Sequence, residues 1–337
     1  RRPPLRRPMP THDLRDRAEP TMSSNVAAAP DENGPARKRP CQRVAAAADG
    51  GSPDAPLAFA SCESHRLRSA GGLDYKLLVS LPLSYHQGAV NSEKGEAYPV
   101  IYVLDAEPYL FPLVTVAART THFFTRTRWH PDFIVVGVVA DLEERFREPS
   151  TNDESCGARP RLDVYRLWDA LRPTRARDYL PTAAESPWGV PGAESLLAVS
   201  GHASTFVDFL GSGLIPFVDE RYRTLQSQRV LIGKSFGGSG VAHAMLDIKY
   251  ARLFSHFILG SPSIAWDERA FFRLEEQSRS SRPPLKAGVF LCHGSEESAG
   301  MVSNAKDFVQ VMSAAGVEVT LDVVPGENHG SVSYPFV

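Results

Sequence analysis

The sequence has few cysteines and no long apolar run, and its charges almost balance. The four cysteines among 337 residues are scattered, with no C-x-x-C pair and no metal-ligand spacing. A zinc site or a disulfide framework is therefore not expected, although a single bridge stays open. No stretch approaches the roughly 20 continuous apolar residues that span a bilayer. The formal net charge of −2 produces no overall electrostatic field that would attract the protein to nucleic acid or an anionic membrane.

These absences narrow the partners and the location. We expect no metal, no organic cofactor, no nucleic-acid partner and no membrane span, which leaves small molecules as ligands. Residues 1–10 lack the apolar core of a secretory signal. The sequence determines neither the compartment nor the oligomeric state, and a cytoplasmic location is the one favoured.

The first part of the chain differs in composition from the rest. Residues 1–56 are rich in Arg, Pro and Ala and show neither a helical nor a strand period, which predicts a disordered tail. The basic run at 37–39 is either a targeting or binding patch or, as the simpler interpretation, solvated charge. We expect one folded domain over residues 57–337.

Strands alternate with helices in that domain. Residues 75–81 alternate as a half-buried strand does, after a Gly-Gly turn that suits a hairpin. Helical spacing begins at Met301 and stops before Gly316. Unbroken β-branched runs, which indicate strands buried on both faces, lie at 100–104, 133–139, 230–232, 257–259 and 289–291, and residues 319–324 alternate. The pattern predicts an α/β fold with a mostly parallel, doubly wound sheet and helices on both faces.

Two stretches depart from this rhythm. Residues 141–200 contain many Arg, Pro and Asp and no clear period, which predicts a long lid-like insertion. Little sequence follows the strand at 319–324, where a helix that closes the sheet would be expected.

The motif with the clearest chemistry is G-x-S-x-G at residues 233–237, centred on Ser235. It follows a strand-like run and precedes a helix-compatible stretch, the context of a nucleophile turn. Such a turn lifts the serine hydroxyl out of the sheet, and residues two before and two after must be small. The alternative interpretation is an ordinary glycine-rich strand-to-helix loop.

An acid and a histidine follow the serine in the order that this type of fold uses. The run at 289–291 leads into Gly294-Ser295-Glu296-Glu297, and the later strand leads into a glycine-rich turn that contains His329. Both turns come at strand carboxyl ends, where open α/β sheets place their active sites. We predict His329 as the base and Glu297 as the acid, with Glu296 as an open alternative and His293 as the reserve histidine.

A tetrahedral intermediate also needs backbone donors. The amide of Phe236, at the start of a helix, is one candidate. The loop after residues 100–104 should supply the second, and we propose Ala106. Asp105 beside it is expected to organise the turn by bonding backbone amides, rather than to bind metal.

The sequence resembles the putative-esterase family of α/β hydrolases, the group that holds esterase D, S-formylglutathione hydrolase and the siderophore (enterochelin-type) esterases. The resemblance runs from about residue 60 to the end and is closest to the siderophore-esterase branch. Its tracts are Y-P-V-I-Y-V-L-D-A-E at 98–107, D-F-I-V-V-G-V at 132–138, R-D-Y-L-P-T at 177–182, L-I-P-F-V-D-E-R-Y-R at 214–223, G-K-S-F-G-G at 233–238, G-S-P-S-I-A-W-D at 260–267 and N-H-G at 328–330.

The resemblance implies an α/β-hydrolase fold and the same roles for Ser235, Glu297, His329 and the amides of Phe236 and Ala106. Three departures stand out. The family has glycine where this chain has Ala106, the 141–200 insertion is long, and the family's final helix is missing, which predicts exposed apolar sheet surface.

The family resemblance also draws attention to two further residues. Arg177 either binds a carboxylate or catecholate of the substrate or, as the favoured alternative, pairs with Asp178 or another acid. Trp266 either lines the substrate pocket or packs beneath its loop.

The sequence therefore predicts a serine hydrolase that cleaves a carboxylic ester through an acyl-enzyme. The alternatives are a thioesterase of the S-formylglutathione hydrolase type, an acyltransferase with the same residues, and a non-catalytic α/β-hydrolase-like binding protein.

Overall fold

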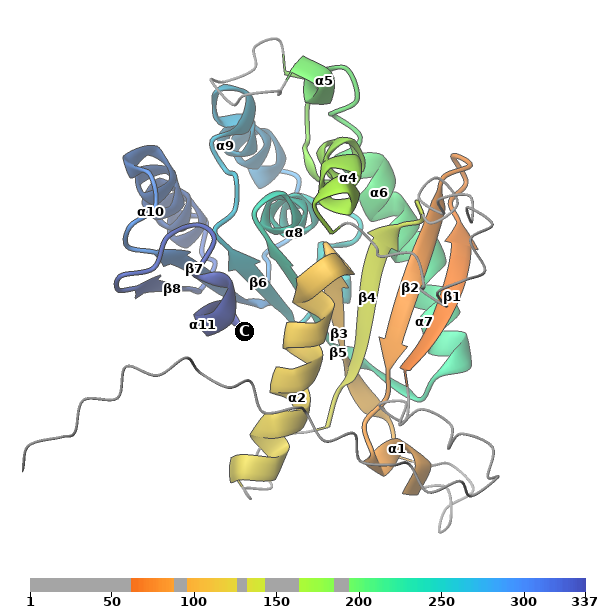
Figure 1. Ribbon diagram of the computed structural model, residues 1–337. Helices are drawn as coiled ribbons and strands as arrows, with labels where there is room; N and C mark the ends of the chain where they lie inside the picture. The colour runs from red at the N-terminus through yellow and green to blue at the C-terminus, as the bar shows by residue number, and fades with distance from the viewer. Residues whose placement is uncertain (1–61, 88–95, 126–131, 143–163, 185–193) are drawn as a thin grey trace, which may run out of the picture. The chain divides into compact units, whose positions relative to one another are not determined.

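A computed structural model describes residues 62–87, 96–125, 132–142, 164–184 and 194–337. Within these residues the chain forms an eight-stranded sheet of order β1-β2-β4-β3-β5-β6-β7-β8 (Figure 1). β1 pairs antiparallel with β2 and β2 antiparallel with β4, and the other neighbours are parallel. The strands are β1 Cys62–Arg68, β2 Asp74–Ser80, β3 Tyr98–Leu104, β4 Ile134–Ala140, β5 Thr224–Lys234, β6 His256–Gly260, β7 Gly288–Gly294 and β8 Val319–Val324.

The mostly parallel α/β sheet predicted from the sequence is confirmed. Every one of the predicted runs coincides with a strand, although the run at 133–139 begins one residue before β4. β3 and β4 are buried along almost their whole length, as strands covered on both faces must be. β1 and β2 form the expected hairpin, with Gly72 in the left-handed region at its turn.

Helices cover both faces of the sheet (Figure 1). One apolar cluster joins one sheet face to α6, α8, α9 and α10, and a second joins the other face to α2 and α11. The α-helices are α1 Ser84–Gln87, α2 Phe111–Thr125, α4 Val164–Tyr179, α5 Glu194–Leu197, α6 Ala203–Phe209, α7 Ile215–Arg221, α8 Phe236–Leu246, α9 Trp266–Arg279, α10 Ala299–Ala314 and α11 Ser333–Phe336. Shorter turns are η2 Ala106–Leu110, η3 Leu210–Leu214 and η4 Ala251–Leu253. No helix in the described part of the chain has the length and apolar character to cross a bilayer.

The segment 141–200 contains a helix that the sequence pattern did not reveal. α4 occupies Val164–Tyr179, although it has Pro173 inside it and no clear apolar period. Its last turns are buried: Ala176 and Leu180 are fully covered, and Arg175 is held by a distant carboxylate. The helix is thus stabilised by tertiary contacts that a local period cannot show. Its role as a lid stays a prediction, and the predicted tail at 1–56 lies outside the described residues.

The sheet edge at β8 is partly open. The side chains of β8 are half-buried or exposed, with Val323 at 37% exposure. The short helix α11 covers part of the neighbouring sheet: Phe336 is 6% exposed, and a Cβ on Gly260 would lie 2.8 Å from its ring.

Candidate active site

Ser235 occupies the sharp turn between β5 and α8. Its backbone has φ 56° and ψ −121°, a left-handed conformation that costs energy for any residue with a Cβ. The turn needs glycine two residues before the serine, because a Cβ on Gly233 would lie 2.4 Å from the carbonyl oxygen of Gly237. The amide of Ser235 donates to the carbonyl of Gly260 on β6 at 2.8 Å. The turn thereby holds the serine side chain at the carboxyl end of the sheet.

Three side chains that are far apart in the sequence meet at this edge. Ser235 Oγ lies 3.1 Å from His329 Nε2, and His329 Nδ1 lies 3.0 Å from Glu297 Oε2. With its proton on Nδ1, the imidazole donates to the carboxylate and accepts from the hydroxyl. The serine, histidine and acid singled out by the sequence analysis therefore form a continuous chain of hydrogen-bonding contacts.

Glu297 is held firmly in place. Its Oε1 accepts from the hydroxyl of Ser261 at 2.5 Å and from the amide of Gly294 at 2.9 Å. Burial raises the pKa of Glu297, but the hydrogen bonds from His329, Ser261 and Gly294 outweigh it and lower that pKa to about 2. The carboxylate is thus ionised at any pH near neutrality. The side chain of Glu296 is exposed, and its amide donates to Glu327, so this neighbour does not face the histidine.

The two predicted oxyanion donors start neighbouring turns. Phe236 is the first residue of α8 and Ala106 the first of η2. The turns are joined directly, because the amide of Gly237 donates to Asp105 Oδ2 at 3.1 Å. In the described part of the chain, neither the Phe236 nor the Ala106 amide donates to another group of the protein. Both amides are thus available to a ligand.

The methyl group of Ala106, which replaces the family's glycine, is buried. Ala106 is 0% exposed, and a Cβ built on Gly137 of β4 would lie 2.8 Å from the Ala106 methyl. The methyl therefore packs against a glycine of the sheet instead of projecting into open space. Gly137 provides the room that the extra carbon needs.

A buried ion pair supports the turn that leads into Ala106. Asp105 has φ 56°, and both its carboxylate oxygens accept from Arg175 on α4, at 2.8 and 2.7 Å. The hydroxyl of Tyr179 accepts from the Asp105 amide at 3.2 Å. Burial lowers the pKa of Arg175, but the charge and hydrogen bonds of Asp105 more than offset this and raise it. Sequence reasoning missed Arg175 and Tyr179, since only the fold brings α4 over this turn.

Arg177, two residues further along α4, points elsewhere. Its guanidinium donates to both oxygens of Asp178, at 2.6 and 2.9 Å, and contacts the hydroxyl of Tyr75. The structure thus places Arg177 in the pair with Asp178 that the sequence had favoured over a substrate contact.

Lys234 is a further residue that sequence reasoning missed. It fills the position before Ser235, is 4% exposed, and its Nζ donates to the backbone carbonyl of His329 at 2.6 Å. Burial lowers the pKa of this ammonium group to about 8. Only the signal of a charged residue inside an apolar strand end could have drawn attention to it.

The other histidines near the motif lie apart from this chain of contacts. His293 is buried at the end of β7, where its Nδ1 donates to the carbonyl of Gly294 at 2.9 Å. His243 on α8 lies 3.1 Å from the hydroxyl of Ser204. Across the described residues, no group of His, Cys, Asp and Glu side chains is arranged to hold a metal ion.

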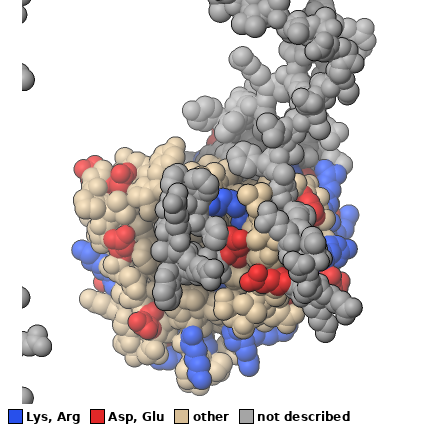
Figure 2. Space-filling model, turned by 90° about the horizontal axis from the view of Figure 1, so that it is seen from below, with Lys and Arg blue, Asp and Glu red and all other residues tan. Residues whose placement is uncertain are grey.

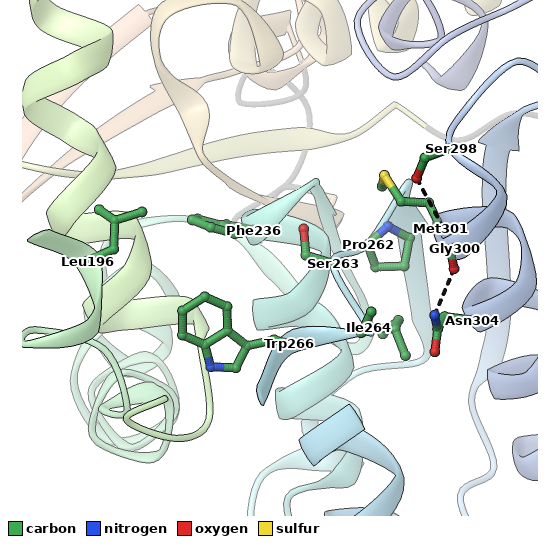
Figure 3. Close-up of a pocket in the computed structure, with 11 residues that line it drawn as sticks. Leu196, Phe236, Pro262, Ser263, Ile264, Trp266, Ser298, Gly300, Met301 and Asn304 are labelled. Atoms are coloured by element: carbon green, nitrogen blue, oxygen red, sulfur yellow. Dashed lines mark hydrogen bonds between the residues drawn. The ribbon is translucent and has the colours of Figure 1, made fainter. Parts of the chain in front are cut away.

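A cavity of about 340 Å³ lies against Phe236, the residue that follows the serine (Figure 3). Phe236 and Ser263 line it, and the amide of Ser263 lies 3.4 Å from the carbonyl oxygen of Ser235. Trp266, the second residue proposed from the family resemblance, forms part of its wall.

Comparison with known proteins agrees with this geometry. The family model described as "Putative esterase" matches residues 179–332, which include Ser235, Glu297 and His329. This part of the chain is similar to the Putative esterase family. The matched segment extends from the end of α4 to the start of α11 and so contains the three residues in contact. No curated protein matches the chain in sequence.

The similarity in fold extends beyond the matched segment. Siderophore hydrolase EstA from Aspergillus nidulans superposes with a TM-score of 0.63 at 21% identity, over 85% of this chain and 94% of its own. An IroE-like serine hydrolase from Shewanella oneidensis gives 0.61 at 22%, over 82% and 77%. The BES protein from Bacillus cereus gives 0.59 at 23%, over 82% and 92%. These likenesses confirm the α/β-hydrolase fold predicted from the resemblance.

Proposed function

We propose that this protein is a serine esterase that cleaves a small-molecule carboxylic ester through an acyl-enzyme, with Ser235 as nucleophile, His329 as general base and Glu297 as the orienting acid. The observation that carries the proposal is the continuous contact from Ser235 Oγ through the His329 ring to Glu297, at 3.1 and 3.0 Å. The family match and the siderophore hydrolases and ferulic acid esterase among the fold neighbours support ester cleavage.

Acylation begins with the serine hydroxyl. A free hydroxyl is a weak nucleophile near pH 7, so His329 Nε2 takes its proton as Oγ attacks the ester carbonyl. The Glu297 carboxylate holds the proton on Nδ1 and stabilises the imidazolium that forms. Its own hydrogen bonds to Ser261 and Gly294 keep it ionised and fixed in orientation.

The carbonyl oxygen becomes an oxyanion in this step. The amides of Phe236 and Ala106 are the donors for it, and the positive end of α8 adds to the favourable field. The ion pair between Asp105 and Arg175 fixes the second turn, so its amide needs little reorganisation when charge develops.

The imidazolium then protonates the leaving alcohol, which departs and leaves an ester on Ser235. A water enters, gives a proton to His329 Nε2 and attacks the acyl group. Collapse of the second tetrahedral intermediate releases the carboxylic acid and restores the serine hydroxyl. Nothing observed favours the thioesterase. Nothing favours the non-catalytic binding protein either, because a binding role has no use for a serine, a base and an acid in contact.

Steady-state kinetics on 4-nitrophenyl acetate test the assignment of roles. Ser235→Ala and His329→Gln should each lower kcat by about 10⁴-fold or more. Glu297→Gln should cost about 10³- to 10⁴-fold, because the amide cannot stabilise the imidazolium or the correct tautomer.

The adjacent Glu296→Gln is a matched control, since that side chain is exposed, and should retain activity within about threefold. Circular dichroism and thermal midpoints establish that each variant is folded. A folded Ser235→Ala variant with undiminished turnover, or equal losses in the two glutamate variants, would refute the assignment.

A further inference from the structure

Two residues that line the cavity directly follow reacting groups in the chain. Phe236, whose amide is an oxyanion donor, lines it, and so does Ser298, the residue after Glu297. Figure 3 shows Leu196, Trp266 and Phe236 along one side, and Pro262, Met301 and Asn304 along the other. A group attached to an ester that reacts at Ser235 can therefore enter this space.

The lining selects for an uncharged group. Its large side chains are apolar or aromatic, and its polar ones are Ser263, Ser298 and Asn304; among the described residues no acid, lysine or arginine faces it. The closest arginine in the site, Arg175, donates to Asp105 and lies over the Phe236 ring at 5.3 Å. A carboxylate or phosphate in this cavity would lose its water without gaining an opposite charge, which is costly.

The wall is fixed before any ligand arrives. The Trp266 ring meets Phe236 edge-on with centroids 6.2 Å apart, and its Nε1 donates to the carbonyl of Thr182 at 3.0 Å. The next three residues have φ of 46°, 49° and 68°, a left-handed turn that orients the tryptophan at the start of α9. The indole and the phenyl ring thus present a rigid apolar surface.

One polar atom of the lining lacks a partner. Asn304 Nδ2 donates to the carbonyl of Gly300, while its Oδ1 is buried and has no hydrogen-bond partner among the described residues. Because this oxygen is closed off from solvent, it adds no polar acceptor to the cavity surface.

We propose that this cavity binds one arm of the ester substrate, and that the arm is uncharged, apolar and bulky, either aromatic or branched aliphatic. The inference rests on the proposed function. The volume of about 340 Å³ falls within the roughly 300–1,000 Å³ of small-molecule sites, so it accommodates a whole ring and not only a methyl group. Each methylene that the arm buries should raise kcat/KM roughly fourfold.

Four ethyl- or acetyl-based esters separate the features of the arm. Ethyl acetate has two small arms, ethyl 3-phenylpropanoate a large acyl arm, 3-phenylpropyl acetate a large alcohol arm, and monoethyl succinate an anionic acyl arm. The wild-type protein should hydrolyse at least one of the phenyl esters about 30-fold or more faster, in kcat/KM, than ethyl acetate. Monoethyl succinate should be no better than ethyl acetate. The phenyl ester that is preferred identifies the cavity as the acyl or the alcohol site.

Met301→Trp fills the cavity from α10, and Ser303→Trp is its matched control, an exposed position on the same helix outside the lining. Met301→Trp should lower the ratio of kcat/KM for the preferred phenyl ester to kcat/KM for ethyl acetate by about tenfold or more. Ser303→Trp should leave this ratio unchanged. If Met301→Trp proves unstable, Trp266→Leu removes the opposite wall and should reduce the same preference.

Equal kcat/KM for ethyl acetate and both phenyl esters would overturn the inference, as would a preference for monoethyl succinate. Equal effects of the two tryptophan variants would do the same. Failure of the proposed function looks different: no ester, ethyl acetate included, would be hydrolysed by the folded protein.

Discussion

The ammonium group of Lys234 donates a hydrogen bond of 2.6 Å to the backbone carbonyl of His329, joining the strand end that carries Ser235 to the turn that carries His329. Lys234 immediately precedes Ser235 and is 4% exposed. The rest of the histidine turn is held from its own side, by Asn328 Oδ1 accepting from Gly330 and Ser331. We therefore expect the lysine to act as a positioning residue that helps to set the distance between Ser235 and His329.

Lys234→Met should lower kcat about 10- to 100-fold and leave KM within about threefold, because a displacement of the histidine near 1 Å costs that much in rate. Burial of the ammonium lowers its pKa to about 8, so its removal should not lower the thermal midpoint by more than a few degrees. Lys306→Met, on the exposed side of α10, is the control. If Lys234→Met lowers the thermal midpoint substantially along with kcat, or leaves kcat unchanged, the lysine has no positioning role.

The pair of Asp105 and Arg175 should be important for stability. Asp105→Asn leaves a buried guanidinium without its counter-charge, which costs about 3–5 kcal/mol in the free energy of unfolding. Arg175→Met should cost a similar amount. The double variant should cost clearly less than the sum, because neither charge is then left alone. Denaturant titrations measure all three, and additive losses would contradict a direct pair.

Ala106→Gly tests whether the methyl that replaces the family's glycine restricts the substrate. Because this methyl is buried against Gly137, its removal should lower the free energy of unfolding by about 1 kcal/mol and change kcat/KM by less than about threefold. Gly137→Ala should be more harmful, about 1–3 kcal/mol, since its Cβ would lie 2.7 Å from Phe111 and 2.8 Å from Ala106. A tenfold gain in kcat/KM for Ala106→Gly would mean that the methyl does face the substrate.

His243 should make the fold sensitive to mild acid. Burial lowers its pKa from 6.5 to about 4, and its Nδ1 has no partner among the described residues. Between pH 6.5 and 4 the unfolded chain binds a proton that the folded chain does not. The free energy of unfolding therefore decreases as the pH is lowered through this range, by on the order of 3 kcal/mol in total.

His243→Gln should flatten this part of the pH profile, measured as the difference between urea midpoints at pH 7 and pH 4.5. His256→Gln, at an exposed histidine, should leave the difference as in the wild type. An unchanged pH profile in the His243 variant would rule out this source of acid sensitivity.

Mixed surface charge agrees with the small net charge. The face seen in Figure 2 has acidic and basic side chains interspersed with other residues.

Sequence patterns predicted those parts of the protein that local chemistry determines. The β-branched runs marked the parallel strands, and the glycines around Ser235 marked its turn, because each depends on neighbours within a few residues. The order of Ser235, Glu297 and His329 could be predicted because the carboxyl ends of parallel strands share one edge.

What the sequence missed depends on contacts between distant segments. Arg175 and Arg177 lie two residues apart on α4, so their side chains point in nearly opposite directions. The family tract drew attention to Arg177, but Arg175 is the residue that reaches Asp105, 70 positions earlier in the chain. Lys234 occupies a variable position of the motif. Its acceptor is the carbonyl of a residue 95 positions away, so no local pattern indicates its contact.

Covalent labelling tests the central claim most directly. The folded protein is incubated with a fluorophosphonate, digested, and its peptides are identified by mass spectrometry. The account predicts a single modified serine, Ser235, at a rate that Glu297→Gln lowers at least about 100-fold while Glu296→Gln leaves it unchanged. A folded wild-type protein that stays unlabelled, or one that is labelled at Ser239, Ser261 or Ser263 instead, would contradict it.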